Sequence, residues 1–187
     1  LNHALEKAGI DVRETDLGEY IIQQFGETPS HIIAPAVHKS KEEIAELFAV
    51  LHQRPKLDDI PALTHEAREI LRPHFLDAGM GITGANFLVA ETGSSMIVTN
   101  EGNGRMTTTM PKVHVAIAGI EKIIPTMEDA SLLLRLLTRS ATGQSISNYI
   151  SVTTGPRRPG DQDGPEEFHV IIVDAGRTAV LGSQIRE

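Results

Sequence analysis

The sequence of 187 residues contains no cysteine and no tryptophan, and its other aromatic residues are two tyrosines and five phenylalanines. The absence of cysteine excludes disulfides, thiol nucleophiles, cysteine-ligated zinc and cysteine-held iron–sulfur clusters from this chain. The scarcity of aromatic side chains argues against stacking platforms for single-stranded nucleic acid.

Long apolar runs and an excess of positive charge are also missing. The longest apolar runs, such as residues 113–120, are far shorter than the roughly 20 residues of a membrane-spanning helix. Acidic residues number 25 against 17 Lys and Arg, and the formal net charge of −8 is unfavourable for binding a polyanion. We therefore expect a globular protein without a membrane span and without a nucleic-acid partner.

Both ends of the sequence resemble positions inside a longer polypeptide. Leu1 opens directly into a helical pattern, without an initiator methionine or the basic and apolar regions of a signal peptide. We expect sequence on both sides of this chain in the whole protein.

Three amphipathic helices are predicted from local signals. The stretch 40–43 is a capping box, and the apolar residues after it lie on one helix face. A second helix over residues 61–77 contains Pro73, which should bend or split it. Thr126 is expected to cap a third helix, whose core-facing residues would be Leu132, Leu133, Leu136 and Leu137.

Strand signals alternate with these helices. The stretch 80–99 predicts two short strands around Gly93, and residues 31–34 predict a brief buried strand. The apolar runs 113–118 and 170–173 predict strands buried on both faces, which is typical of a parallel sheet between helix layers. We expect a three-layer α/β/α Rossmann-like sandwich over residues 1–187, with a surface loop at 155–167 and a terminal hairpin at Gly176.

Several short motifs do not support the chemistry that their letters suggest. Residues 79–84 match G-x-G-x-x-G, but the preceding segment is helical and the following one reads as strand, so we interpret them as a glycine-rich turn. His65 and Glu66 begin like a zinc protease motif, yet position 69 is Glu rather than His. We expect no metal site, and we expect His52, His65 and His74 to lie on solvated faces.

The stretch 91–114 combines features of an anion-binding site. Two glycines allow left-handed backbone angles and close approach of a ligand, and consecutive backbone N–H groups can form an anion-binding nest. Hydroxyl and cationic side chains would add donors for a carboxylate or phosphate. The candidate ligand-binding residues are Thr92, Gly93, Asn100, Glu101, Gly102, Asn103, Gly104, Arg105, Thr107, Thr108, Thr109, Lys112 and His114. The alternative is a structural turn whose side chains satisfy their own backbone.

Glu91 is the candidate catalytic residue, because it lies between an apolar run and Gly93. We expect it to be buried, which would raise its pKa, and close to Arg105, which would lower its pKa. A structural role for Glu91 is the alternative. A second cluster, residues 139–144 with Arg157 and Arg158, could contact an anion or form a solvated loop.

At this same stretch the sequence resembles a known family. The segments AETG (90–93) and TNEGNGRMTTTMPKVH (99–114) resemble the LUD domain of the lactate-utilisation B proteins. The flanking segments TDLGEYIIQ, PSHIIAPAVHKS, RSATGQ and TGPRRPGDQDGPEEFHVIIVD are similar to the same family, so the resemblance covers nearly the whole chain.

The resemblance implies a fold like that of ribose-phosphate isomerases and coenzyme A transferases. It also implies a bacterial, cytoplasmic role in oxidising L-lactate to pyruvate, together with two companion lactate-utilisation proteins. Family members of this type carry an N-terminal extension and a C-terminal ferredoxin-like segment with two [4Fe–4S] clusters. This chain includes no such motif, so the clusters and electron transport would belong to the missing C-terminal part.

Three hypotheses for the chain itself follow. In the first, it is the LUD domain of an iron–sulfur subunit and binds a small anionic metabolite at residues 91–114. In the second, it is a transferase- or isomerase-like enzyme that uses Glu91, although the Glu-Asn-Gly motif of some coenzyme A transferases is not reproduced there. In the third, it is a non-catalytic docking domain.

Overall fold

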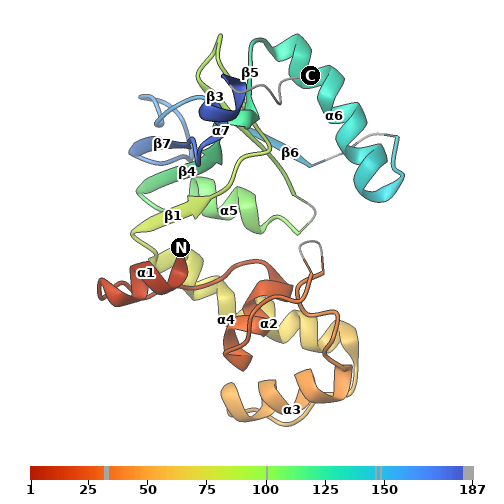
Figure 1. The fold of residues 1–187 in the computed structure, drawn as a ribbon. Helices are drawn as coiled ribbons and strands as arrows, with labels where there is room; N and C mark the ends of the chain where they lie inside the picture. Colours follow the sequence, from red (N-terminus) through yellow and green to blue (C-terminus); the bar gives the residue numbers. More distant parts are fainter. Residues whose placement is uncertain (32–33, 100, 146, 148, 183–187) are drawn as a thin grey trace. The chain divides into compact units, whose positions relative to one another are not determined.

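The computed structural model of the chain describes residues 1–31, 34–99, 101–145, 147 and 149–182. Its contacts divide the chain into two compact units, Leu1–Asp77 and Ala78–Glu187 (Figure 1). The described part of the first unit is helical, and the described strands all belong to the second.

The described residues of the first unit form four helices, α1 (Asn2–Lys7), α2 (Leu17–Phe25), α3 (Lys41–Leu51) and α4 (Ile60–Asp77). The predicted capping box is confirmed at α3: Ser40 Oγ accepts from the Glu43 N–H, and the Glu43 carboxylate accepts from the Ser40 N–H. α4 continues through Pro73 without being split. The brief strand expected at residues 31–34 includes positions 32 and 33, which lie outside the described residues.

The core of the first unit is built from buried residues of three helices. Tyr20 and Ile22 come from α2 and Phe48 comes from α3, and all three are buried. α4 adds the buried apolar residues Leu63, Ala67, Leu71 and Phe75. The apolar spacing read from the sequence therefore produces a helical core of the expected kind.

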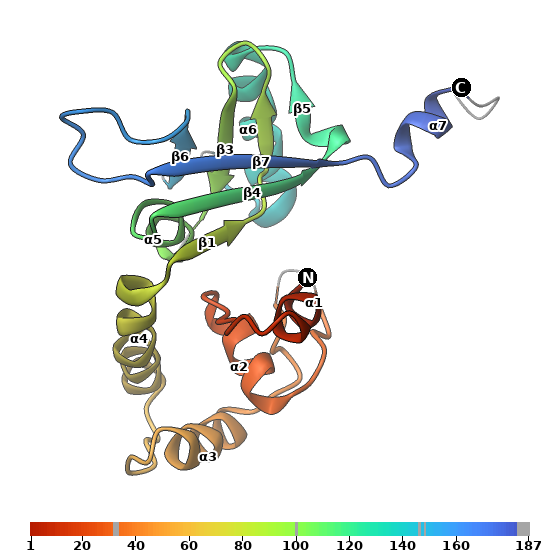
Figure 2. The same cartoon turned by 90° about the vertical axis from the view of Figure 1, so that its left-hand side faces the viewer.

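The second unit contains a parallel sheet of three strands in the order β1-β4-β7 (Figure 2). These strands are β1 (Met80–Thr83), β4 (Val113–Gly119) and β7 (Glu167–Val173). The short helix α5 (Asn103–Thr109) packs against β1. This contact is close, because a Cβ atom at Gly81 would clash with the Thr107 carbonyl oxygen. The glycine-rich segment predicted as a turn is therefore partly strand.

A second sheet has the strand order β5-β2-β3-β6. Its strands are β2 (Phe87–Val89), β3 (Ser94–Val98), β5 (Ile123–Ile124) and β6 (Ile150–Thr153), and the 3₁₀ turn η1 (Ile120–Lys122) precedes β5. The long helix α6 (Met127–Thr142) packs on this sheet through a buried cluster. The cluster contains Val89, Met96, Ile124 and Ala130, with Phe87, Leu133 and Leu134 packed against it.

The helices and the parallel strands confirm the predicted α/β class. β4 is largely buried, as expected for residues 113–118. The expectation for residues 170–173 is wrong within this chain, because β7 is exposed at the sheet edge. Leu132 and Leu136 of α6 are also exposed rather than core-facing, since the helix turns Leu133 and Leu134 toward the sheet. The expected terminal hairpin is a short helix, α7 (Arg177–Leu181).

Candidate functional site

Glu91 lies in the tight turn that joins β2 to β3. Gly93 has a φ of 67°, and its N–H donates to the Val89 carbonyl at 2.9 Å. Glu91 is exposed, and its Oε1 accepts a hydrogen bond of 2.7 Å from the Met127 N–H in the first turn of α6. The expected burial of Glu91 is therefore wrong. Its negative charge instead satisfies a donor at the positive end of a helix, which is a stabilising arrangement.

A chain of three hydroxyl groups lies beside this turn. Thr92 Oγ1 and Ser94 Oγ are 2.7 Å apart, and Ser94 Oγ lies 2.7 Å from Thr154 Oγ1. Ser94 is only 2% exposed, so these bonds satisfy a buried hydroxyl. Ser94 and Thr154 were not among the candidate residues. Nothing in the local sequence signals their pairing, because they are 60 positions apart.

The glycine- and threonine-rich part of the candidate site is the helix α5 rather than an open loop. Its first turn follows Gly102, which has a φ of 79°. The Thr107 hydroxyl donates to the Asn103 carbonyl, and the Thr108 and Thr109 hydroxyls both donate to the Arg105 carbonyl, each at 2.9 Å. Thr107 and Thr108 are also buried. The alternative reading, in which these hydroxyls satisfy their own backbone, fits the geometry better than a ring of ligand donors.

Glu91 and α5 lie at opposite ends of β3. Glu91 belongs to the turn immediately before Ser94, where the strand begins. Gly104 lies against Thr99, just beyond the end of the strand, because a Cβ atom at Gly104 would be 2.5 Å from Thr99 Cγ2. Five residues of extended chain cover about 17 Å. The expected closeness of Glu91 and Arg105 is therefore wrong, and the stretch 91–114 does not converge on one point.

His114 is enclosed by the parallel sheet. It is 1% exposed, its ring stacks on Phe168 with centroids 5.1 Å apart, and its Nε2 lies 2.9 Å from Thr83 Oγ1. Its Nδ1 is buried without a hydrogen-bond partner among the described residues. Burial lowers the pKa of His114 from 6.5 to about 4, so the ring is neutral at physiological pH. Enclosure prevents His114 from touching a ligand in this structure.

The remaining candidates are spread around α5. Glu101, Arg105 and Lys112 are exposed, and Asn103 is half-buried. Asn100 lies outside the described residues. The Lys112 carbonyl accepts from the N–H groups of Glu166 and Glu167, which attaches the loop 155–167 to the beginning of β4.

Residues 139–142 of the second cluster form the end of helix α6, and only Arg157 and Arg158 lie in the loop 155–167. Arg157 forms an ion pair of 2.9 Å with Glu166, and the Arg158 N–H donates to Asp161 Oδ2 at 2.7 Å. Both arginines are exposed. These contacts match the solvated-loop reading.

A buried polar cluster in the first unit was missed by the sequence analysis. Tyr20 Oη lies 2.9 Å from His52 Nε2, and His52 Nδ1 lies 2.8 Å from Glu66 Oε1. The side chains of His52 and Glu66 are each 3% exposed, so the expectation that His52 is solvated is wrong. The signal that could have found the pair is the position of Glu66 on the apolar face of α4, between Leu63 and Ala67.

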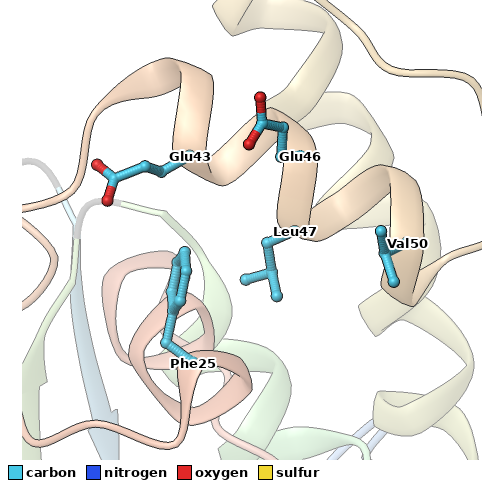
Figure 3. Close-up of a pocket in the computed structure, with 5 residues that line it drawn as sticks. All are labelled: Phe25, Glu43, Glu46, Leu47 and Val50. Atoms are coloured by element: carbon cyan, nitrogen blue, oxygen red, sulfur yellow. The ribbon is translucent and has the colours of Figure 1, made fainter.

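One shallow hollow of about 340 Å³ lies between α2 and α3 (Figure 3). It is lined by Phe25, Glu43, Glu46, Leu47 and Val50. Both carboxylates already have partners: Glu43 belongs to the capping box, and Glu46 forms an ion pair of 2.9 Å with Lys56. The hollow therefore offers an apolar patch with no polar group directed at a ligand.

Two further findings concern the described residues only. They contain no group of three or more His, Asp or Glu residues arranged to hold a metal ion. None of their helices combines the length and the apolar character that crossing a membrane requires.

These features define an α/β domain whose candidate polar residues mostly bind its own backbone. A model of the LUD domain family matches residues 2–173, so the chain belongs to the LUD domain family.

The chain is also similar to individual known proteins. The chain is 51% identical over all 187 residues to Lactate utilization protein B of Shouchella clausii (strain KSM-K16), and 49% identical to Lactate utilization protein B of Bacillus subtilis (strain 168). It spans 39% of the length of each relative. A crystal structure of a DUF162 family protein from Deinococcus radiodurans matches 92% of this chain and 93% of that one, with 18% identity and a TM-score of 0.42.

Proposed function

We propose that this chain is the LUD region of a cytoplasmic protein that takes part in oxidising L-lactate to pyruvate. The observation that carries the proposal is the similarity along the whole chain to proteins named Lactate utilization protein B. These relatives are more than twice as long as the chain, so the activity belongs to the whole protein rather than to this region alone.

The redox centres of such a protein would lie outside these residues. Oxidation of lactate to pyruvate releases two electrons and two protons, and therefore needs an electron acceptor. The chain has no cysteine, and its His, Asp and Glu residues form no metal-binding group in the described part, so its donor set does not fit an iron–sulfur cluster. We assign the two expected [4Fe–4S] clusters to the remainder of the polypeptide.

Within that protein, the contacts favour a positioning role for this chain over acid–base catalysis. The Glu91 carboxylate holds the first turn of α6, and the threonine hydroxyls of α5 hold the backbone of their own helix. A docking domain needs surfaces rather than free catalytic groups. The two companion lactate-utilisation proteins are the proposed partners.

Binding of a small anion at residues 91–114 stays part of the proposal. After the hydroxyl contacts are taken into account, the side chains that offer positive charge to lactate or pyruvate are Arg105 and Lys112, both exposed. Arg105 precedes the buried threonines on α5, and Lys112 precedes β4. A ligand there would contact the surface of the domain rather than an enclosed pocket.

Growth on lactate tests the proposed role. A Bacillus subtilis strain without its own Lactate utilization protein B would receive the full-length gene that encodes this chain, or the same gene without the codons for residues 1–187. We expect the full gene to restore growth on L-lactate, the shortened gene to fail, and growth on glucose to be the same for both. If the shortened gene also restored growth on L-lactate, the LUD region would not be needed for lactate oxidation.

A further inference from the structure

β7 is an edge strand of the parallel sheet (Figure 2), and its apolar residues are exposed. Val170, Ile171, Ile172 and Val173 are 39%, 48%, 51% and 40% exposed. Ala116 and Ala118, their neighbours on β4, are 0% and 6% exposed. Because consecutive residues of a strand point to opposite faces, both faces of β7 are open along this segment.

A strand that is apolar on both faces is unusual at a solvent-exposed surface. Strands that are apolar on both faces are typical of parallel sheets covered on both sides. Natural edge strands carry proline, lysine or inward-pointing charge, which prevents unwanted pairing. β7 has the sequence EFHVIIV, whose polar residues Glu167 and His169 both lie in its first half. The second half of β7 therefore has the composition of a covered strand.

The path of the chain after β7 is fixed close to this apolar surface. Ala175 and Gly176 have φ angles of 47° and 82°, which produce a tight turn. The Asp174 carboxylate accepts hydrogen bonds of 2.9 Å from the Thr178 N–H and the Thr178 hydroxyl. The Arg177 Nε lies 2.7 Å from Glu121 Oε2, which ties the start of α7 to the segment after β4.

α7 carries further exposed apolar residues beyond the end of β7. Its residues Val180 and Leu181 are 57% and 63% exposed, although α7 follows β7 directly. Because α7 begins four residues after the end of β7, polypeptide that continues from α7 stays tethered near that strand, and its local concentration there would be high. The relatives are longer than this chain, since about three fifths of their length lies outside the matched region.

We propose that the polypeptide following residue 187 in the full-length protein folds back over β7 and covers its apolar residues. The LUD region and the C-terminal remainder would then form one continuous apolar interface rather than two domains joined by a free linker. The inference rests on the proposed function only in requiring that the protein continue beyond residue 187. A second copy of the chain is the competing occupant.

Hydrogen exchange on the full-length protein tests this inference, with peptides that cover residues 168–173. We expect these peptides to exchange at least about tenfold more slowly than peptides from β6, an edge strand that is likewise paired on one side only, because a covered strand opens rarely. Ile172→Lys should speed exchange in β7 and in the segment after residue 187 together. The control is Val37→Lys, which adds the same charge at an exposed apolar position of the first unit and should leave both regions unchanged.

Each other outcome overturns the inference. Exchange of β7 as fast as that of β6 in the unmodified protein would mean that nothing covers the strand. A change of oligomeric state in Ile172→Lys, with unchanged exchange after residue 187, would assign the surface to a second copy. The absorbance of the iron–sulfur clusters, recorded on the same samples, separates the two proposals: clusters with an unprotected β7 contradict only this inference, whereas a protected β7 without clusters contradicts only the proposed function.

Discussion

The imidazole Nδ1 of His52 and the carboxylate Oε1 of Glu66 lie 2.8 Å apart inside the helical unit, where both side chains are almost fully buried. His52 is the C-cap residue of α3, and Glu66 lies on α4, so the pair joins the two helices. Phe48 packs against the imidazole with ring centroids 4.7 Å apart, and Tyr20 reaches its other nitrogen. The pair is therefore a structural link in the core.

Removing one partner of this pair should destabilise the first unit. In Glu66→Ala, His52 loses its buried hydrogen-bond acceptor, and we expect the free energy of unfolding to fall by about 3 kcal/mol. Urea unfolding followed by circular dichroism measures the change. The control is Glu69→Ala on the same helix, whose carboxylate forms an exposed ion pair with Arg54 and should contribute little. Equal effects of the two substitutions would show that burial of the His52–Glu66 pair adds no stability.

The contact between β1 and α5 predicts a sharp difference between two neighbouring glycines. A methyl group at Gly81 would clash with the Thr107 carbonyl oxygen, whereas a Cβ atom at Gly79 meets nothing within 4 Å. We expect Gly81→Ala to lower the free energy of unfolding by about 1–3 kcal/mol. Gly79→Ala should be nearly neutral. Thermal unfolding measures the stability of both variants. Equal stability of Gly81→Ala and Gly79→Ala would contradict the packing of α5 on β1.

Burial of His114 predicts a dependence of stability on pH. Its pKa is about 4 in the folded protein, against 6.5 for an unperturbed histidine. Between these values the unfolded chain binds a proton that the folded chain does not, so stability is full above pH 6.5 and falls as the pH decreases toward 4. The loss from this one group approaches about 3 kcal/mol at pH 4.

The difference between wild type and His114→Gln isolates this contribution, because other titrating groups are common to both proteins. We expect a flatter decrease in the variant, measured by urea unfolding at pH 7, 6, 5 and 4. NMR titration of the imidazole in the wild type is the independent measurement if the variant does not fold. A titration midpoint near 6.5 in the folded protein would contradict the enclosed position of His114.

Anion binding at α5 predicts a specific effect of Arg105. Calorimetric titration of the full-length protein with L-lactate, pyruvate or inorganic phosphate should give an affinity that Arg105→Ala weakens by about tenfold, the effect of losing one charge-assisted contact. Arg135→Ala on α6 removes another exposed positive charge elsewhere and is the matched control. Identical affinities in both variants for all three anions would place any ligand away from α5.

Two substitutions at Glu91 distinguish a reactive carboxylate from a residue that positions α6. Glu91→Gln keeps an oxygen that can accept from the Met127 N–H, whereas Glu91→Ala removes it. A positioning role predicts faster hydrogen exchange at the start of α6 in the Ala variant and partial rescue in the Gln variant. Equal and complete loss of lactate-dependent electron transfer in both variants, with unchanged exchange in α6, would support catalysis by Glu91 instead.

Features determined by near neighbours in the sequence could be predicted well. The capping box at Ser40 and the N-cap at Thr126 need only residues three positions apart, and both form as expected. The glycine turn at Gly93 and the apolar strand β4 were likewise predicted from local patterns. The α/β class followed from the alternation of these elements.

Features determined by distant residues could not be predicted in this way. Residues 103–109 are rich in threonine and glycine, which have low helix propensity, yet packing of α5 against Gly81 makes them helical. The burial of His52 depends on Glu66, and the separation of Glu91 from Arg105 depends on the direction of β3. The composition of β7 predicts a covered strand, but nothing in the described part of the chain covers it.

The most direct test of the account is the response of the iron–sulfur clusters to L-lactate in the full-length protein, assembled with its two companion proteins under anaerobic conditions. We predict that L-lactate decreases the visible absorbance of the clusters as they accept electrons, and that deletion of residues 1–187 abolishes this response while the clusters remain bound. Two results would contradict the account. In the first, the clusters of the intact assembly stay oxidised when L-lactate is added. In the second, L-lactate reduces the clusters equally well without residues 1–187.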